Sequence, residues 1–537
     1  MVNNILHLGQ STRNTLLKLK SRTMIKNFKW LLFASLAFVA CNNEDEVIAD
    51  ANSSDGMALT AGSANFSKYV ALGDSFAAGY SDGALFIKGQ EGAYPNVLSQ
   101  QFALVGGGAF TTPLMLDNIG GFSMGGFQIP QFGTRLYFDG VGPAPVAGPT
   151  TTSIAAKLTG QFNNMGIPGA KSFHLVTPGY AALNPYFGRF ASSAGTTVLA
   201  DGVSQNATFF SLWIGGNDVL TYATSGGIGI NQISNTNPAT YGSNDITNPT
   251  VFAGAFNALV TGLTANGAKG VVANLPYVNT LPFFTTVPTN PIPLDATNAA
   301  TLNGLFGSLN AVFASLNETK PRFATLAAIS TNPLLIIDET LEPRAAAIKT
   351  ALTPTYGPTF AGLIGDIFSQ ARHASNVVGS KDFILLTSRG VLGKPVNGLD
   401  PNTTVVVPPF GPFSALGVSY PLLDRHVLTA DEALQVKVAT DAFNITIQTT
   451  ANGKGLAFVD TKVVMDQLGN GGITANGYKV TSAYVTGGAF SLDGVHPSPR
   501  GYALIGNKFI EAINTTYGSN LKGVNLSNYR ILFPKSL

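Results

Sequence analysis

The sequence predicts an α/β fold with a parallel central sheet. Three observations carry this prediction: 45% of the 537 residues are hydrophobic, short apolar runs recur along the chain, and segments of helical pattern separate them. Apolar runs of this length, without alternation, are typical of strands that are buried on both faces. The expected strands are residues 68–73, 207–214, 269–276 and 455–460.

The expected helices lie between these runs. One helix is predicted over 251–268, and a stronger one begins at Leu428, where Thr429 can cap the N-terminus and Glu432 completes a capping box. The segment 499–513 is predicted to form the closing helix, because a proline at its start suits the first helical turn. Functional groups of parallel sheets lie beyond the carboxyl ends of the strands, so we expect them in the loops that follow the apolar runs.

Two long regions interrupt the alternation of strands and helices. Residues from about 105 to 152 are rich in Gly, Pro and Phe, and residues from about 282 to 421 form a longer insertion with helical stretches at 299–317 and 358–373. Within the longer insertion, 334–338 is expected to be a further strand. Long ordered connections are more often functional than not, so these insertions are predicted to form a lid, a substrate wall or a small second domain.

The first 40 residues are predicted to be a signal peptide whose true start is Met24. A short basic segment precedes an apolar run over 30–40, which is shorter than the roughly 20 residues that span a bilayer. The residues that end in Cys41 resemble the lipobox of bacterial lipoproteins, which implies cleavage before Cys41 and attachment of a diacylglyceryl group to its sulfur. An ordinary secretory signal with a chance cysteine is the alternative.

Cys41 is the single cysteine, so no intrachain disulfide is possible. An acid-rich run over 42–46 opens a polar stretch to about Phe66 that lacks a core-forming pattern, and a lipidated flexible tether is therefore predicted over 41–66. An acidic run directly after the lipid-bearing cysteine resembles the surface-export signal of Bacteroidetes lipoproteins. The folded domain is expected over 67–537.

The formal charge of +2 hides a mildly acidic mature chain. Residues 1–40 hold six basic residues and no acidic one, so their removal leaves 25 basic against 29 acidic residues, a net charge of −4. Only 11% of the residues are charged, against roughly 25% in an average soluble protein. No basic cluster lies elsewhere, and nucleic acid is therefore excluded as an expected partner.

A Gly-Asp-Ser sequence at 73–75 follows the first expected strand. A tight turn led by glycine would expose the hydroxyl of Ser75 at the start of a helix. A serine hydroxyl is a weak nucleophile at neutral pH and needs a base within hydrogen-bond reach. Asp74 is expected to accept backbone N–H groups rather than to act as a catalytic acid. Taken alone, the sequence is also typical of a helix N-cap in a loop.

The expected base lies at the other end of the chain. Asp493 and His496 are three residues apart, and Pro497 follows them directly before the closing helix. This spacing lets the carboxylate fix the imidazole tautomer while the other ring nitrogen faces Ser75, as nucleophilic hydrolysis requires. An ordinary Asp-Gly surface turn is the alternative interpretation of the same residues.

Four blocks in this order resemble the GDSL-type, or SGNH, family of esterases and lipases. The blocks are 69–79, 164–169, 215–218 and 493–502. One departure is Phe76, which stands where the family name has Leu; this hydrophobic exchange is not expected to alter the chemistry. The resemblance covers about 67–96, 161–282 and 422–514 and leaves the two insertions unexplained. It implies a flavodoxin-like three-layer α/β/α fold.

The resemblance also implies which groups stabilise the oxyanion of the reaction. They are the backbone N–H of Ser75, the backbone N–H of Gly169 and the side-chain amide of Asn217. Each such donor typically lowers the barrier by ~2.7–4 kcal/mol. The chain has 60 glycines and many similar spacings, so Gly166 stays open as an alternative to Gly169. A plain turn after a strand is the alternative for 215–218.

The remaining titratable residues offer few rival sites. His426 is the only other candidate base, because His174 and His373 lack a patterned partner and are expected at packing or surface positions. No group of His, Asp and Glu has metal-ligand spacing, and no glycine-rich stretch ends like a phosphate-binding loop. Neither a metal nor an organic cofactor is therefore expected.

The sequence thus predicts a serine ester hydrolase that acts on lipid or acyl esters. Its membrane anchor would be the lipid on Cys41, and its expected location is the bacterial envelope, as an outer-membrane lipoprotein that can face the cell surface. Two alternatives stay open: an esterase that removes acetyl or acyl groups from carbohydrate, and a surface binding lipoprotein that kept the fold but lost turnover. The intact set of Ser75, Asn217, Asp493 and His496 favours an enzyme.

Overall fold

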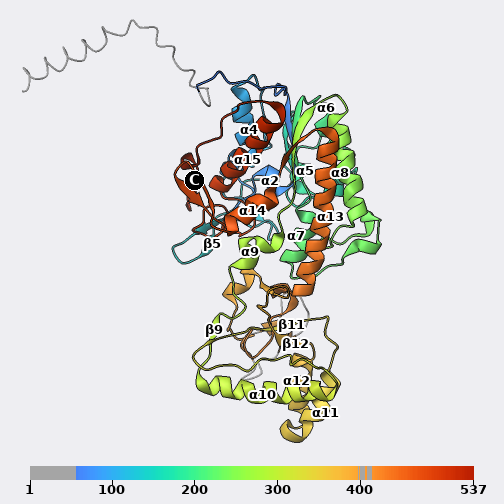
Figure 1. The fold of residues 1–537 in the computed structure, drawn as a ribbon, viewed down its shortest axis with the longest axis vertical. Helices are drawn as coiled ribbons and strands as arrows, with labels where there is room; N and C mark the ends of the chain where they lie inside the picture. The colour runs from blue at the N-terminus through green and yellow to red at the C-terminus, as the bar shows by residue number, and fades with distance from the viewer. Residues whose placement is uncertain (1–55, 397, 400–405, 408–413) are drawn as a thin grey trace, which may run out of the picture. The chain divides into compact units, whose positions relative to one another are not determined.

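A five-stranded parallel sheet lies at the centre of the folded region (Figure 1). The computed structural model describes residues 56–396, 398–399, 406–407 and 414–537, so the predicted signal peptide and Cys41 lie outside the described residues. All neighbouring strands of the sheet are parallel, which confirms the predicted α/β class. In spatial order the strands are β17 (Ala457–Val459), β8 (Lys269–Ala273), β7 (Phe209–Trp213), β1 (Tyr69–Gly73) and β6 (Asn164–Gly166).

The three strands β6, β1 and β7 end at the same level. In the register of the sheet, Gly73 of β1 lies opposite Gly166 of β6 and Trp213 of β7. A Cβ atom on Gly73 would lie 2.4 Å from the carbonyl oxygen of Trp213, and one on Gly166 would lie 2.2 Å from the nitrogen of Ala78. Glycine is therefore required at both strand ends, where the chain passes closely from one element to the next.

Two groups of helices cover the two faces of the sheet (Figure 1). One hydrophobic core joins them, and within it the rings of Phe252 and Phe443 stack at 4.2 Å. The first group comprises α4 (Tyr94–Ala103), α14 (Thr461–Gly469) and α15 (Pro499–Tyr517). The second comprises α6 (Val198–Ser204), α8 (Pro249–Thr264) and α13 (Ala430–Lys454).

Helix α13 begins where its sequence predicts. Thr429 is the N-cap, and its backbone N–H donates to a carboxylate oxygen of Glu432 at 2.8 Å. Gly455 ends the helix in the left-handed conformation, with φ of 63°. The closing helix α15 extends to Tyr517, whose hydroxyl donates to the carbonyl of Gly270 in β8 at 2.7 Å.

The folded region begins before the predicted end of the tether. The ring of Phe66 stacks on that of Phe102 with centroids 4.0 Å apart, and Ala64 is also part of the hydrophobic core. The backbone N–H of Ser63 donates to the carbonyl of Tyr517 at 2.8 Å. The tether predicted to reach about Phe66 therefore ends earlier, because Ala64 and Phe66 supply core surface that the polar composition around them masks.

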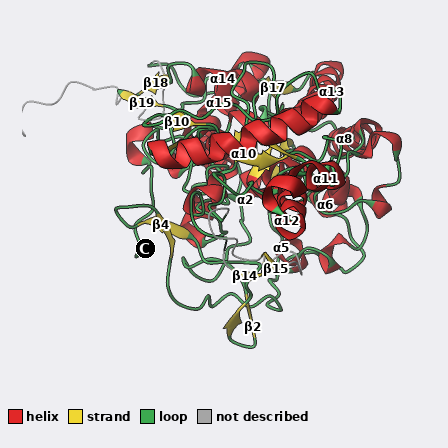
Figure 2. Ribbon diagram, turned by 90° about the horizontal axis from the view of Figure 1, so that it is seen from below, coloured by secondary structure: helices red, strands yellow, loops and turns green. Residues whose placement is uncertain are grey.

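The first predicted insertion contains two small antiparallel hairpins. In Figure 2 the labelled strands β2 and β4 lie among loops rather than between helices. Arg135 is buried here, and its guanidinium donates to the carbonyls of Asn118, Pro534 and Lys535 at 2.7–3.0 Å, which fastens the hairpins to residues 534–535. The strands are β2 (Ser123–Met124), β3 (Phe127–Gln128), β4 (Leu136–Phe138) and β5 (Pro143–Pro145).

The second predicted insertion has hydrophobic cores of its own. One is centred on Phe306 and Phe368, and another joins Ile336 to Val427 at the root of α13. Its helices are α9 (Pro282–Thr285), α10 (Ala296–Ser315), α11 (Ala345–Tyr356) and α12 (Pro358–Phe368). Its strands are β9 (Ile292–Pro293), β10 (Thr331–Asn332), β11 (Leu335–Ile337), β12 (Ala371–His373), β13 (Phe383–Ile384), β14 (Gly398–Leu399) and β15 (Val406–Val407).

One expectation for this insertion is confirmed and another needs correction. The strand predicted over 334–338 is present as β11, which pairs antiparallel with β12 outside the central sheet. The helix predicted over 358–373 ends at Phe368, and His373 lies in β12 instead. The pairing with β11 decides this outcome, because a short apolar run has no periodicity that separates a helix end from a strand.

The remaining elements are short. Within the part of the chain that the structure describes, no helix combines the length and the apolar character needed to cross a membrane. These short elements are α2 (Ser75–Ala78), α3 (Ile87–Glu91), α5 (Pro185–Gly188), α7 (Asn217–Thr224), β16 (Val427–Leu428), β18 (Ile473–Ala475) and β19 (Tyr478–Val480).

Candidate active site

The fold brings the predicted site residues to one edge of the sheet. Ser75 follows β1, Gly169 follows β6, and Asn217 follows β7, and these three strands are neighbours. Carboxyl ends of parallel strands share one edge, so residues almost 150 positions apart in sequence meet there. Asp493 and His496 reach the same place from the loop that precedes α15.

Ser75, His496 and Asp493 form a continuous chain of hydrogen bonds. The Nε2 atom of His496 lies 2.8 Å from Oγ of Ser75, and its Nδ1 atom lies 2.9 Å from Oδ2 of Asp493. Ser75 itself is buried to 5% exposure at the first position of α2. The distances match those of a hydroxyl whose proton can pass to a ring nitrogen that a carboxylate orients.

Backbone donors hold the carboxylate of Asp493 in place. Its Oδ1 accepts the N–H groups of Val495 and His496 at 2.9 and 2.8 Å, and its Oδ2 accepts the N–H of Gly83 at 3.0 Å. Burial raises the pKa of Asp493, but the nearby imidazole and these hydrogen bonds outweigh it, so the pKa lies below its ordinary value. The carboxylate is therefore ionised when it faces His496.

A buried aspartate that the sequence did not single out supports this loop. Asp82 accepts the N–H of Leu492 at 2.8 Å, and its own N–H donates to Oγ of Ser491 at 2.9 Å. Burial raises its pKa to about 7. Its only sequence signal is an Asp-Gly pair, which is common in turns, so its role depends on a partner about 410 residues away.

The second insertion also contacts the loop of Asp493 and His496. The N–H of Phe283 in α9 donates to the carbonyl of Gly494 at 2.9 Å. Gly494 has φ of 73°, and a Cβ atom there would lie 2.9 Å from a methyl carbon of Leu386. Glycine is thus required between the two catalytic candidates, because the insertion packs directly against the backbone.

Gly169 offers a donor that Gly166 does not. The N–H of Gly166 donates to Oδ1 of Asn164 at 3.0 Å. No hydrogen bond engages the N–H of Gly169 among the described residues. Its φ is 78°, and a Cβ atom added there would meet no other atom within 4 Å. Of the two alternatives left by the sequence, Gly169 is the one whose N–H can still bind an oxyanion.

Asn217 is tied to the same loop. Its Nδ2 donates to the carbonyl of Ala170 at 3.0 Å, which leaves the second amide hydrogen for another acceptor. The next residue, Asp218, is fully buried and accepts both the N–H and the hydroxyl of Ser172 at 2.8 Å. These contacts fix the start of α7 against the loop after β6, so the two oxyanion candidates have one fixed arrangement.

Asp74 acts locally, as the sequence led us to expect. Its Oδ1 accepts the N–H of Phe76 at 3.0 Å and so caps α2. Burial raises the pKa of Asp74 to about 7, more than that hydrogen bond and the nearby His496 lower it. It makes no hydrogen bond to Ser75 or His496 in the described part of the chain.

The other histidines lie away from the nucleophile. The backbone carbonyl of His426 accepts from Leu385 and Ser388 at the root of the insertion. Nδ1 of His174 accepts the N–H of Lys171, and burial lowers the pKa of His174 to about 4. Burial lowers the pKa of His373 to about 4 as well, so both are neutral packing residues.

The structure assembles one acidic cluster that the sequence did not reveal. Carboxylate oxygens of Glu339, Asp424 and Glu432 lie within 4.8 Å of one another, and these residues could hold a metal ion. Burial, followed by the neighbouring carboxylates, raises the pKa of Asp424 to about 8, and burial raises that of Glu432 to about 7. Glu339 is far in sequence from Asp424 and Glu432, so the spacing of the residues could not indicate the full cluster.

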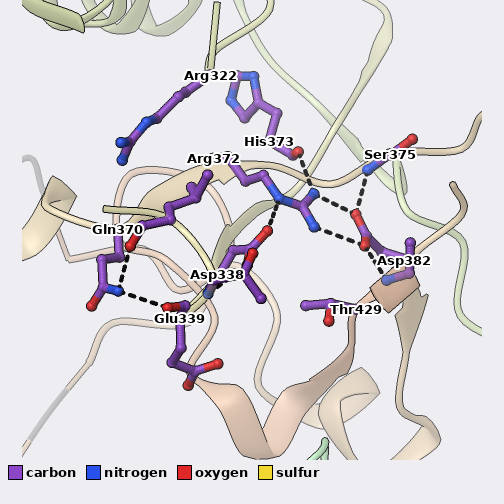
Figure 3. A network of polar contacts seen from close by, with 12 residues as sticks. Arg322, Asp338, Glu339, Gln370, Arg372, His373, Ser375, Asp382 and Thr429 are labelled. Carbon is purple, nitrogen blue, oxygen red and sulfur yellow. Dashed lines mark hydrogen bonds and ion pairs between the residues drawn. The ribbon is translucent and has the colours of Figure 1, made fainter. Parts of the chain in front are cut away.

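A second charged network stabilises the insertion rather than the site. Figure 3 shows Arg372 between two aspartates. Its guanidinium contacts Asp338 at 2.5 Å and both carboxylate oxygens of Asp382 at 2.6 and 2.9 Å. Asp382 is fully buried and also accepts the N–H of Ser375 at 2.7 Å. Every charge here has an opposite partner, so the network is a structural ion pair.

Two cavities lie next to the site. An apolar cavity of about 70 Å³ passes beneath Phe76 and Trp213 toward α14 and α15. An open groove of about 1030 Å³ lies between the insertion and residues 468–486, and Arg389, Lys479 and Tyr484 line it. The hydroxyl of Tyr484 donates to the carbonyl of Leu492 at 2.6 Å, which places this end of the groove beside Asp493.

No protein-family model matches the chain, and no curated protein and no solved structure is significantly similar to it.

Proposed function

We propose that this chain is a serine hydrolase that works through an acyl-enzyme. The observation that carries the proposal is the hydrogen-bond chain from Ser75 to His496 to Asp493, with distances of 2.8 and 2.9 Å. A binding protein gains nothing from a buried serine, an imidazole and an ionised carboxylate in this order. Within that class, the resemblance to SGNH enzymes favours a hydrolase of carboxylic esters.

The order of the strands supports the finer assignment of the fold. Numbered by their place in the chain, the five strands of the sheet run 2-1-3-4-5 in space, which is the order of flavodoxin-like sheets. Three of the four blocks that resemble the SGNH family follow strands 1, 2 and 3 of this order, and the fourth precedes α15. We therefore assign the chain to the flavodoxin-like SGNH fold as part of this proposal.

The mechanism follows from the roles of the three side chains. Oγ of Ser75 attacks the ester carbonyl carbon while its proton passes to Nε2 of His496, and Asp493 stabilises the imidazolium. The tetrahedral intermediate expels the alcohol, which takes the proton from His496. Water, activated by the same imidazole, then hydrolyses the acyl-enzyme and releases the acid.

The oxyanion of each tetrahedral intermediate needs donors that are already aimed at it. Ser75 contributes its backbone N–H at the start of α2, Gly169 contributes an N–H that is otherwise unengaged in the described chain, and Asn217 contributes an amide hydrogen. Because contacts between the loop after β6 and α7 fix two of these groups, little reorganisation accompanies the reaction.

The groove supports a second candidate, the removal of acyl groups from carbohydrate. Its volume of about 1030 Å³ exceeds what a small alcohol fills, and threonine and serine side chains line it beside Arg389 and Lys479. Apolar side chains such as Val287, Ile292 and Leu392 complete the lining, and a wide, open surface that mixes both kinds of group suits the alcohol part of an acylated glycan. Attachment through Cys41 and an envelope location remain part of the proposal and concern residues outside those described.

Labelling with a fluorophosphonate tests the proposed function. The purified protein should form a covalent adduct on Ser75 and hydrolyse p-nitrophenyl acetate, and Ser75→Ala should abolish both while its unfolding temperature stays unchanged. The expected loss of activity is about 10⁴-fold or more, because the nucleophile is removed and only the binding site and the oxyanion donors remain. Adduct formation at another residue, or turnover by the Ser75→Ala variant, would overturn the assignment.

A further inference from the structure

An apolar cavity begins directly beside the catalytic groups. Its volume is about 70 Å³. The residues that line its near end are direct chain neighbours of Ser75, Asn217 and His496, namely Asp74, Phe76, Gly216 and Pro497. The cavity therefore adjoins the site through these chain neighbours, and a group attached to the carbonyl carbon that Ser75 attacks would reach it past Phe76.

The walls of the cavity select an apolar occupant. Only two lining side chains are polar, Asp74 and Thr461, and the hydroxyl of Thr461 already donates to Asn274. Hydrophobic side chains from both flanking helices complete the walls, among them Met465 of α14 and Leu504 of α15. Apart from the carboxyl of Asp74, the walls offer few partners to a polar group that loses its water here, whereas a hydrocarbon chain gains apolar contacts.

Phe76 stands between the base and the cavity. The centroid of its ring lies 5.2 Å from that of His496 and 4.8 Å from that of Trp213, and Trp213 also lines the cavity. A phenyl ring at this position narrows the entrance more than the leucine of the family name would. The residue that departs from the resemblance is thus the one that controls access from Ser75 to the apolar space.

We propose that this cavity binds the acyl chain of the ester and that Phe76 and Met465 set the length of chain accepted. This inference rests on the proposed ester hydrolase and names its substrate class, esters of short-chain fatty acids. A volume of about 70 Å³ holds roughly two to three methylene groups, at about 25–30 Å³ each. The preferred acyl group has about three to four carbons on this estimate, because the carbonyl carbon stays outside at Ser75.

The proposal is tested by measuring kcat/KM for a series of p-nitrophenyl esters from acetate to laurate. Below the size limit, each added methylene should raise kcat/KM about fourfold, because each leaves water for an apolar wall. The profile should turn at about four carbons, where further methylenes no longer fit. A flat profile, or one that falls steadily from acetate, would overturn the proposal.

Two tryptophan variants on α14 distinguish filling of the cavity from the general effect of a large side chain on this helix. Met465→Trp places a large ring in the cavity, whereas Val463→Trp places the same ring on the outer face of α14, where Val463 is 48% exposed. Met465→Trp should lower the ratio of butyrate to acetate kcat/KM at least about tenfold, and Val463→Trp should leave the ratio unchanged. Phe76→Leu should shift the optimum toward longer chains. Equal ratios in all variants would contradict the proposal.

Alkyl phosphonates distinguish failure of this proposal from failure of the proposed function. Methyl and propyl p-nitrophenyl phosphonates are offered to the wild type and to Val464→Phe, a milder filling of the same cavity that guards against misfolding of Met465→Trp. Faster labelling of Ser75 by the propyl probe, lost in Val464→Phe, supports the cavity. Equal labelling by both probes overturns the cavity but leaves the hydrolase standing. No labelling of Ser75 by either probe overturns both.

Discussion

The parallel-sheet core and the insertion over 282–421 place buried charges in opposite ways. In the insertion, Arg372 bonds to Asp338 and Asp382, so each charge is matched where it stands. At the edge of the sheet, Asp493 faces His496, and His496 faces a neutral hydroxyl, that of Ser75. In the insertion, all the charged groups of this network are bonded to one another. At the edge of the sheet, the chain of hydrogen bonds ends at the hydroxyl of Ser75, a group that can react.

The comparison shows that an aspartate beside a basic side chain can have a structural role or a chemical one. Burial lowers the pKa of Arg372, but the two aspartates outweigh it and raise the pKa further above its ordinary value, so no proton moves at any ordinary pH. In the site, the pKa of Asp493 is lowered by an imidazole that can itself gain or lose a proton. A buried charge therefore indicates catalysis only when its partner can change protonation.

Among the variants that test this comparison, Asp493→Asn is expected to have the largest effect, a loss of kcat. The amide keeps the shape but no longer stabilises the imidazolium, and its NH₂ group favours the wrong tautomer of His496, so kcat should fall about 10³–10⁴-fold. Steady-state kinetics with p-nitrophenyl acetate measures this loss. Asp82→Asn is the matched control, since Asp82 is buried and supports the same loop without contacting His496. Equal losses in the two variants would argue against a catalytic role for Asp493.

Next in size is the effect of Arg372→Ala on stability. The change leaves the fully buried Asp382 without its ion pair, which costs about 3–5 kcal/mol in the free energy of unfolding. Urea unfolding followed by circular dichroism measures it. Arg344→Ala should cost no more than about 1 kcal/mol, because Arg344 is partly exposed and makes a single contact with Glu318 at 3.1 Å. If both variants unfolded alike, the network around Arg372 would not stabilise the insertion.

Asn217→Ala should have a smaller effect, confined to the chemical step. Loss of one oxyanion donor lowers kcat about 10²–10³-fold while KM changes little. The variant also loses the hydrogen bond to Ala170, so the unfolding temperature is measured alongside the kinetics. A rise in KM with unchanged kcat would assign Asn217 to substrate binding instead.

The smallest expected effect is a pH dependence at the acidic cluster. The folded pKa of Asp424, about 8, lies above its unfolded value near 4, so the folded protein holds a proton that the unfolded chain releases. The protonated carboxyl of Asp424 therefore contributes to the free energy of unfolding at low pH, and this contribution is lost as pH rises through the folded pKa. Asp424→Asn removes this loss and should gain about 1–2 kcal/mol relative to wild type between pH 5 and pH 8, with allowance for solvent screening.

Thermal unfolding at the two pH values measures this gain. Asp366→Asn, an exposed change on α12 of the insertion, should show no such pH dependence and serves as the control. A gain of equal size at both pH values would show that Asp424 does not carry a raised pKa.

Local sequence patterns fix much of the fold. The apolar runs at 68–73 and 207–214 become β1 and β7, and Thr429 with Glu432 starts α13, because burial on both faces and helix capping are decided by nearby residues. The same holds for Ser75, Asn217 and Gly169, which follow strand ends. The short strand β6 is absent from the prediction, since three residues offer too little apolar pattern to recognise.

The tertiary structure alone decided which residues that are distant in sequence are in contact. The sequence by itself determined which residues are candidates for the reactive groups, because a hydroxyl, an imidazole and a carboxylate are chemical identities. It did not determine that Asp82 supports the loop of Asp493, that Phe283 packs on Gly494, or that Glu339 joins the acidic cluster. These contacts join segments from separate parts of the chain, and only the packing of sheet, helices and insertion brings them within bonding distance.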